Sequence, residues 1–150
     1  MSENPNEEQQ LNTNIMMGKL KSDEFPYDDW VDPNFLTADI RDFFDDLFLG
    51  TDMQRSDIIR TAGISRTYGY QIMDGTRVGK RDYYLSIAIA MKLDLRMTQR
   101  LLAITKNAAL HPLIKRDAAI IFAINHGHDN YRLYGFLVEL GLEPLDTGIE

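Results

Sequence analysis

Apolar residues recur every three to four positions from residue 37 onward, which is the spacing of amphipathic helices. The first stripe consists of Ile40, Phe43, Phe44, Leu47 and Phe48, and six further segments read as helices after it. Glycines follow the stripes where helices commonly end, at positions 50, 63, 75, 127 and 141. No segment alternates apolar and polar residues as a strand would. The pattern therefore predicts an all-α fold of about seven short helices.

Polar residues and one proline indicate where these helices begin. The tetrapeptide Thr51-Asp52-Met53-Gln54 has the pattern of a capping box, so we expect the second helix to open there. Pro112 suits the first turn of the sixth helix, and the fourth helix follows Gly79. Side-chain caps are expected for the first, third and seventh helices at Thr37, Ser65 and Asp129, and the fifth helix is expected to start at Asp94.

Composition divides the chain into three regions. Residues 1–36 are expected to form an acidic, largely irregular arm, because residues 1–22 are polar and residues 23–36 mix acids with four aromatics and two prolines. Residues 37–106 form the main helical domain. Residues 107–150 form a helical hairpin, in which the run AAIIFAI is apolar all round a helix. We expect this hairpin to pack on the main domain, to form a homodimer interface, or to do both.

The net charge of −7 is distributed unevenly along the chain. Residues 1–50 carry a charge of −9, residues 51–116 carry +7, and residues 117–150 carry −5. Such asymmetry says more about partners than the total does, and a basic central block favours a polyanion such as nucleic acid. The acidic-aromatic arm is expected either to dock on the folded body or to compete with DNA or a protein partner for the basic block.

Within this basic block, residues 54–75 (QRSDIIRTAGISRTYGYQIMDG) predict two short helices joined by a tight turn. Gly63 allows a left-handed turn, and apolar residues such as Ile58, Ile64 and Ile72 can seal the two helices together. The second helix presents polar residues near its N-terminus. These are the parts of a helix-turn-helix DNA reader, although an αα-hairpin in any helical bundle has the same parts.

Residues 53–95 resemble the helix-turn-helix domain of the Xre and phage-repressor family of transcription regulators. The resemblance rests on DIIRTAGISRT, QIMDGTR and YYLSIAIAMKLDL, which follow one another at the family's spacing. With the flanking helices it covers about residues 37–105. TYGYQI, DGTR, QRLL and RDAAIIFAINHG are similar to a bacterial subgroup with an extra C-terminal helical hairpin. The resemblance implies a five-helix DNA-binding domain that reads double-stranded DNA, with a recognition helix at about residues 65–74 in the major groove.

The resemblance also implies which residues touch DNA. The implied base contacts are Ser65, Arg66, Thr67, Tyr70 and Gln71. The implied phosphate contacts are Arg55, Arg77, Lys80 and Arg81. The chemistry is suitable, because arginine binds guanine and glutamine binds adenine with two hydrogen bonds, and threonine meets the thymine methyl group.

Gly69 departs from the family pattern, since that position usually holds a buried aliphatic residue. We expect Tyr68 or Tyr70 to fill the space, and a Tyr70 that points inward would belong to the core. Such departures leave an alternative open: a helix-turn-helix-fold protein-interaction module, an antirepressor or partner-binding adaptor, that does not bind DNA and uses the tyrosine surface or the acidic arm.

Other chemistry is not favoured. The chain has no cysteine and no glycine-rich phosphate loop. Its His126-Gly127-His128-Asp129 segment is typical of a helix end followed by an aspartate cap. We therefore expect no enzymatic activity, no metal and no cofactor. The absence of a long apolar run and of a secretory signal predicts a cytoplasmic protein with no membrane contact.

Overall fold

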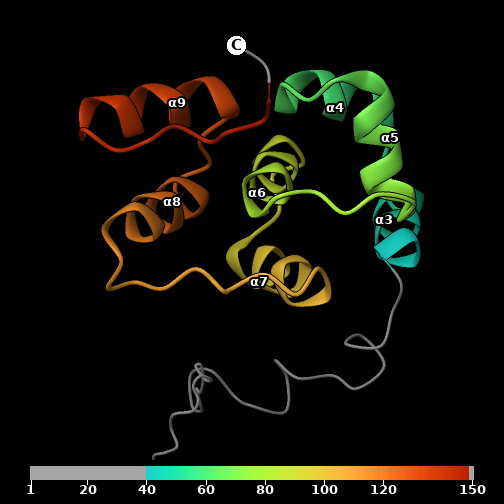
Figure 1. The fold of residues 1–150 in the computed structure, drawn as a ribbon, viewed down its shortest axis with the longest axis horizontal. Coiled ribbons are helices and arrows are strands. Elements are labelled where there is room, and N and C mark those ends of the chain that lie inside the picture. The colour runs from blue at the N-terminus through green and yellow to red at the C-terminus, as the bar shows by residue number, and fades with distance from the viewer. Residues whose placement is uncertain (1–39, 149–150) are drawn as a thin grey trace, which may run out of the picture. The chain divides into compact units, whose positions relative to one another are not determined.

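The computed structural model describes residues 40–148, which form seven helices and no strand. The all-α prediction is confirmed for this part of the chain. The helices are α3 Ile40–Leu49, α4 Arg55–Ala62, α5 Arg66–Asp74, α6 Arg81–Ala90, α7 Leu95–Ile104, α8 Lys115–Asn125 and α9 Asn130–Glu139. All of them belong to one compact unit, Ala38–Glu150 (Figure 1). The arm predicted for residues 1–36 and the predicted cap Thr37 lie outside the described residues.

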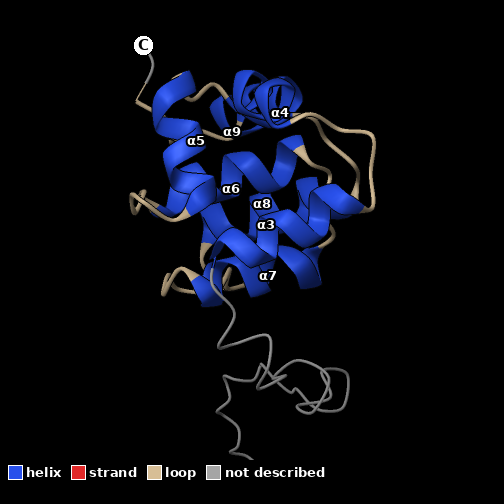
Figure 2. Cartoon of the chain, turned by 90° about the vertical axis from the view of Figure 1, so that its right-hand side faces the viewer, coloured by secondary structure: helices blue, strands red, loops and turns tan. Residues whose placement is uncertain are grey.

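Helix α6 forms the centre of this unit (Figure 1). Its residues from Tyr83 to Ile89 are all buried, and it packs against α4, α7 and α9. A serine in this buried run satisfies polar groups of two neighbouring helices: the Ser86 hydroxyl donates to the Ala62 carbonyl at 2.6 Å, and Asn130 donates to the Ser86 hydroxyl at 3.1 Å. Figure 2 shows the described chain as helices joined by loops, with no strand.

Several predicted helix ends are confirmed. The Asp94 carboxylate accepts the Met97 N–H at 2.9 Å, and the Asp129 carboxylate accepts the Arg132 N–H at 2.8 Å, so both aspartates cap their helices. Gly63 follows α4 with φ of 77°. At this φ a residue with a side chain would be strained, which explains why the turn after α4 requires glycine.

Two predicted helix starts are wrong. Helix α4 begins at Arg55 rather than at Thr51, whose hydroxyl accepts the Met53 N–H at 3.2 Å in the loop before the helix. Helix α8 begins at Lys115, so Pro112 does not stand in its first turn. The amide groups after Pro112 turn back to His111 instead: the Leu113 N–H bonds the imidazole Nδ1 at 3.0 Å.

The dipeptide Arg-Asp stands in the first turn of both α6 and α8, and each arginine pairs with the aspartate of the other helix. Arg81 binds Asp117 through two hydrogen bonds of 3.0 and 3.1 Å, and Arg116 binds Asp82 through two of 2.9 and 3.1 Å. Side chains of both pairs are largely buried. This reciprocal clamp fastens the α8–α9 pair to α6, and the Asp82 hydrogen bonds raise the pKa of Arg116.

The segment after α9 runs back alongside that helix toward α4 (Figure 1). Its carbonyl groups at Glu143 and Pro144 accept hydrogen bonds from Arg116, and the Asp146 N–H donates to Asp82 at 2.9 Å. The clamp therefore also holds the C-terminal segment. None of the described helices is long and apolar enough to cross a membrane.

Candidate nucleic-acid interface

Helices α4 and α5 approach each other closely at Gly69. A Cβ atom at this position would lie 2.5 Å from Ile59 Cγ2 and 2.8 Å from Ile59 Cγ1. The side chain of Ile59, buried to 1% exposure, occupies the space that a larger residue on α5 would need. The expectation that Tyr68 or Tyr70 fills this space is wrong, because the filling group comes from α4. Glycine is needed here for close packing of the two helices.

One face of α5 points away from the core. Ile72 and Met73 are buried against the body, whereas Ser65, Arg66 and Thr67 are exposed. Among the described residues no side-chain hydrogen bond caps α5, so the expected Ser65 cap is not made although Ser65 stands at the N-cap position. The first turn of α5 therefore carries exposed polar side chains and free backbone N–H groups, both of which can reach an anionic or polar ligand.

Gln71 and Arg77 are joined on the outer side of α5. The Arg77 Nε–H donates to Gln71 Oε1 at 3.0 Å, and the guanidinium lies 5.5 Å from the centre of the Tyr68 ring. These contacts fix the glutamine carbonyl and hold a guanidinium beside it. Tyr68 in turn packs edge-on against Tyr83 of α6, with ring centres 5.1 Å apart. The pair is therefore supported from the core.

Tyr70 is half-buried and lies on the opposite side of α5 from Tyr68. It lines a surface hollow of about 530 Å³ together with the α3–α4 loop and the start of α4. Arg55 and Ser56 of α4 line the same hollow. The Gln54 side chain makes no capping hydrogen bond to α4, although the Gln54 carbonyl accepts the Asp57 N–H at 3.1 Å. A helix start with a cation and a hydroxyl suits a phosphate group. Ser56 was not among the predicted contacts, because no motif in the sequence distinguishes it.

Four cations were expected to contact phosphate, and the structure places them in different environments. Arg55 pairs with Asp45 and lies over the Phe48 ring at 4.6 Å. Lys80 pairs with Asp146 at 3.0 Å, which raises the pKa of Lys80 and lowers that of Asp146. Both side chains remain partly exposed. Neither countercharge was expected from the sequence, because Asp45 lies 10 positions from Arg55 and Asp146 lies 66 positions from Lys80.

Arg81 is occupied within the protein. Besides its two bonds to Asp117, it donates to the carbonyl groups of Ala108 at 2.9 Å and Ala109 at 3.2 Å. An arginine has five N–H groups, and four hydrogen bonds leave it little capacity for a phosphate. We therefore remove Arg81 from the residues assigned to DNA. Its hydrogen bonds in the clamp account for its position.

Arg66 and Arg77 form no ion pair with any carboxylate in residues 40–148. Arg66 lies 5.9 Å from the Tyr70 ring centre, and Arg77 is held by Gln71 and Tyr68. Asp74 lies nearby at the end of α5, where hydrogen bonds from the Thr76 N–H and hydroxyl lower its pKa and keep it ionised. Arg66 and Arg77 are therefore two exposed cations in and after α5 that no described carboxylate neutralises.

The histidines do not gather with other metal ligands. Among the described residues no three or more histidine, aspartate or glutamate side chains are close enough to hold a metal ion. His126 Nδ1 lies 2.8 Å from the Phe122 carbonyl, and His128 is buried beside the rings of Phe122 and Phe136.

No protein-family model, no curated protein and no solved structure matches this chain.

Proposed function

We propose that this protein is a sequence-specific regulator of transcription that binds double-stranded DNA through α5. The observation that carries the proposal is the outer face of α5, where Arg66, Thr67 and Gln71 are accessible and Arg66 and Arg77 have no described countercharge. The turn at Gly63 and the resemblance of residues 53–95 to Xre and phage-repressor regulators support the same reading.

The proposed binding mode places α5 in the major groove. Arg66 and Thr67 in its first turn meet base edges, and Gln71 meets a base one turn later while Arg77 fixes its carbonyl. Arg55 and Ser56 hold a phosphate at the start of α4, and Arg77 and Lys80 hold another after α5. Lys80 has to exchange Asp146 for the phosphate. Because Arg55 also carries a countercharge, we expect modest non-specific affinity and greater dependence on base contacts.

Selection of bound duplexes from a random library by the full-length chain is the first test. We expect an enriched motif, against which Arg66→Ala weakens binding about tenfold or more and relaxes the preference at one position. Lys80→Ala weakens all duplexes alike and flattens the salt dependence. Lys115→Ala is the matched control, because it removes an exposed charge from α8, on the other side of α6 (Figure 1). Absence of duplex binding at low salt overturns the proposal.

A second candidate function is a protein-interaction module without DNA binding. It is favoured by the charge balance of residues 40–148, which hold 14 basic and 13 acidic residues and so lack a large positive field. In that case the half-buried Tyr70 and the hollow beside it form the partner surface. A protein partner that is lost on Tyr70→Ala, with no effect on any duplex, would favour this function over the first.

A further inference from the structure

Helix α9 exposes a face that the fold of one chain does not use. Leu133 and Leu137 are buried to 1% and 0% exposure and fix the inward side of the helix. On the other sides, Tyr131 is 87% exposed, Tyr134 57% and Val138 50%. Isolated apolar residues on a surface are ordinary, but a contiguous aromatic face marks a binding surface.

Gly135 lies at the centre of this exposed face. With a rotation of 100° per residue, it points almost directly away from Leu133 and Leu137. Apart from its chain neighbours and the backbone of α9, no described atom lies within 4 Å of the position where a Cβ would be, so packing inside the described chain does not require glycine here. A mid-helix glycine lowers helix stability relative to alanine. A glycine at such a position allows another helix to approach closely, which can offset this loss of helix stability.

Charged residues lie on one side of Gly135 and apolar residues on the other. Tyr131 and Arg132 precede Gly135 by one turn, and Val138 and Glu139 follow it by one turn. Arg132 and Glu139 are seven residues apart, which is about 10 Å along a helix, too far for them to pair with each other. Neither forms an ion pair with any other residue between 40 and 148.

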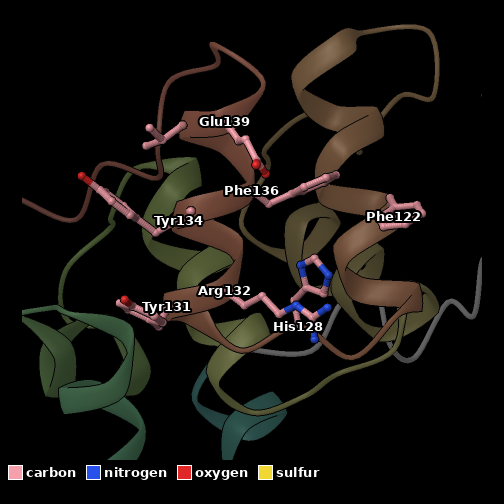
Figure 3. A pocket seen from close by; sticks show the side chains of 9 residues that line it. Phe122, His128, Tyr131, Arg132, Tyr134, Phe136 and Glu139 are labelled. Carbon is pink, nitrogen blue, oxygen red and sulfur yellow. The ribbon is translucent and has the colours of Figure 1, made fainter.

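The α8 side widens this face. Phe122 is 45% exposed and stacks on Phe136 with ring centres 5.4 Å apart. Together with His128 these rings line a hollow of about 740 Å³ that extends over α9. Figure 3 shows Tyr131 and Tyr134 pointing to one side of α9 and Phe136 to the other, with Arg132 and Glu139 toward opposite ends of the helix.

From this arrangement we infer that the α9 face binds a second copy of this chain, with the two α9 helices antiparallel about a two-fold axis at Gly135. Such an axis reverses the helix direction but keeps each side of the face on the same side. Arg132 therefore meets Glu139 of the other copy, twice, and Tyr131 meets Val138 of the other copy, twice. A surface that is complementary to itself under one rotation is what an isologous dimer requires.

The pairing leaves the proposed DNA surface free. Helix α6 separates α9 from α5 in Figure 1, so both copies of α5 remain exposed in the dimer. The inference does not depend on DNA binding, and its test contains no DNA. A helix of ten residues is about 15 Å long, so the interface is small and the dimer is expected to be weak and reversible.

Sedimentation of the full-length chain between about 10 µM and about 500 µM tests the inference. We expect a monomer–dimer equilibrium that Arg132→Glu weakens at least about tenfold, because like charges then face each other twice. The double variant Arg132→Glu/Glu139→Arg restores the pairing with the charges exchanged, and it should dimerise within about threefold of the unaltered chain. Lys115→Glu, a reversal outside the α9 face, should leave the equilibrium unchanged.

Gly135→Ala supplies a second readout. Because the position is open in one chain, alanine should raise the melting temperature by about 4 °C at low concentration, where the monomer dominates. The same methyl group stands where the two helices approach and should weaken dimerisation. A chain that stays monomeric throughout the range overturns the inference. So does a dimer that is indifferent to Arg132→Glu, or a charge exchange that fails to restore what the single reversal removed.

Discussion

Helices α4 and α5 and helices α8 and α9 each form a pair with a short connection that contains a left-handed glycine, Gly63 in the first and Gly127 in the second. Each pair also has a glycine inside its second helix. Gly69 in α5 faces Ile59 at a distance that excludes any side chain, whereas Gly135 in α9 faces open space. The same residue type therefore serves packing within the chain in one pair and leaves an open surface in the other.

The two pairs also differ at the start of their second helices. Asp129 caps α9 through the Arg132 N–H, but in the described residues no side chain caps α5. The outer face of α5 is polar and positively charged at Arg66, while that of α9 has exposed tyrosines on one side and the charged pair Arg132 and Glu139 on the other. The two pairs therefore present different chemistry at their surfaces, and this difference underlies the two proposals, a polyanion at α5 and a second copy of the chain at α9.

The largest expected effect comes from breaking the clamp that fastens the α8–α9 pair to α6. Asp117→Ala removes the partner of Arg81 and the acceptor of the His111 N–H, and it leaves a partly buried guanidinium unpaired. We expect a loss of about 3 kcal/mol in the free energy of unfolding, measured by urea titration. Asp57→Ala is the control, because its pair with Arg60 is exposed and should change stability by less than about 0.5 kcal/mol. Equal effects of the two substitutions would contradict the buried role of Asp117.

Gly69→Ala and Gly135→Ala together test the difference between the two glycines. The added methyl group collides with Ile59, so we expect a loss of about 1–3 kcal/mol in the free energy of unfolding. Gly135→Ala, measured in the same way at low concentration, should gain about 0.5–1 kcal/mol from helix propensity. A double-mutant cycle with Ile59→Ala should show strong coupling to Gly69→Ala, because the smaller residue removes the collision. Additive effects would exclude this explanation.

A smaller effect on stability is expected from substitutions at the starts of α9 and α5. Asp129→Ala removes the hydrogen bond to the Arg132 N–H and should cost about 1 kcal/mol. Ser65→Ala stands at the corresponding position of α5, where the serine side chain makes no capping bond to a described residue, and should cost less than half as much. Thermal unfolding of both variants measures the difference. If Ser65→Ala proves the more damaging, the open start of α5 is contradicted.

The smallest effect concerns pH. Burial, followed by the charges of Arg132, His126 and Lys92, lowers the pKa of His128, which Asp129 opposes. The unfolded chain therefore binds a proton at this position more readily than the folded chain. Stability from His128 is complete above its unfolded pKa, about 6.5, and is lost as the pH falls from there toward the lower folded value. Unfolding titrations at pH 7.5 and 5.5 should differ less for His128→Phe than for the unaltered chain; an equal difference would contradict this assignment.

Local sequence features predicted the helices well because their causes lie within a few residues. Apolar spacing defined the stripes, and Asp94, Asp129 and Gly63 marked helix ends through bonds and backbone angles close in the chain. The helix starts predicted from Thr51 and Pro112 were wrong. Each residue is compatible with a helix start, but in the structure the hydrogen bonds at Met53 and His111 hold these segments as loops.

The availability of the candidate site residues was less predictable. The sequence identified the charged and polar residues around α5, but it could not show that Lys80 faces Asp146 or that Arg81 belongs to the clamp. It also gave no indication that Ile59 occupies the space beside Gly69. These facts depend on groups brought together from distant positions, and a pattern of residue types contains no such distances.

By itself, then, the sequence determined an all-α chain with its helix order and a basic central block flanked by acidic regions, because periodicity, capping and charge are properties of neighbouring residues. The tertiary structure alone decided which charges are cancelled and which faces are left open. Arg81 and Asp117 are 36 positions apart, and only their approach in space removes that arginine from the surface. Arg66, Arg77 and the α9 face remain accessible for the converse reason: no described carboxylate reaches either arginine, and no described helix covers Gly135.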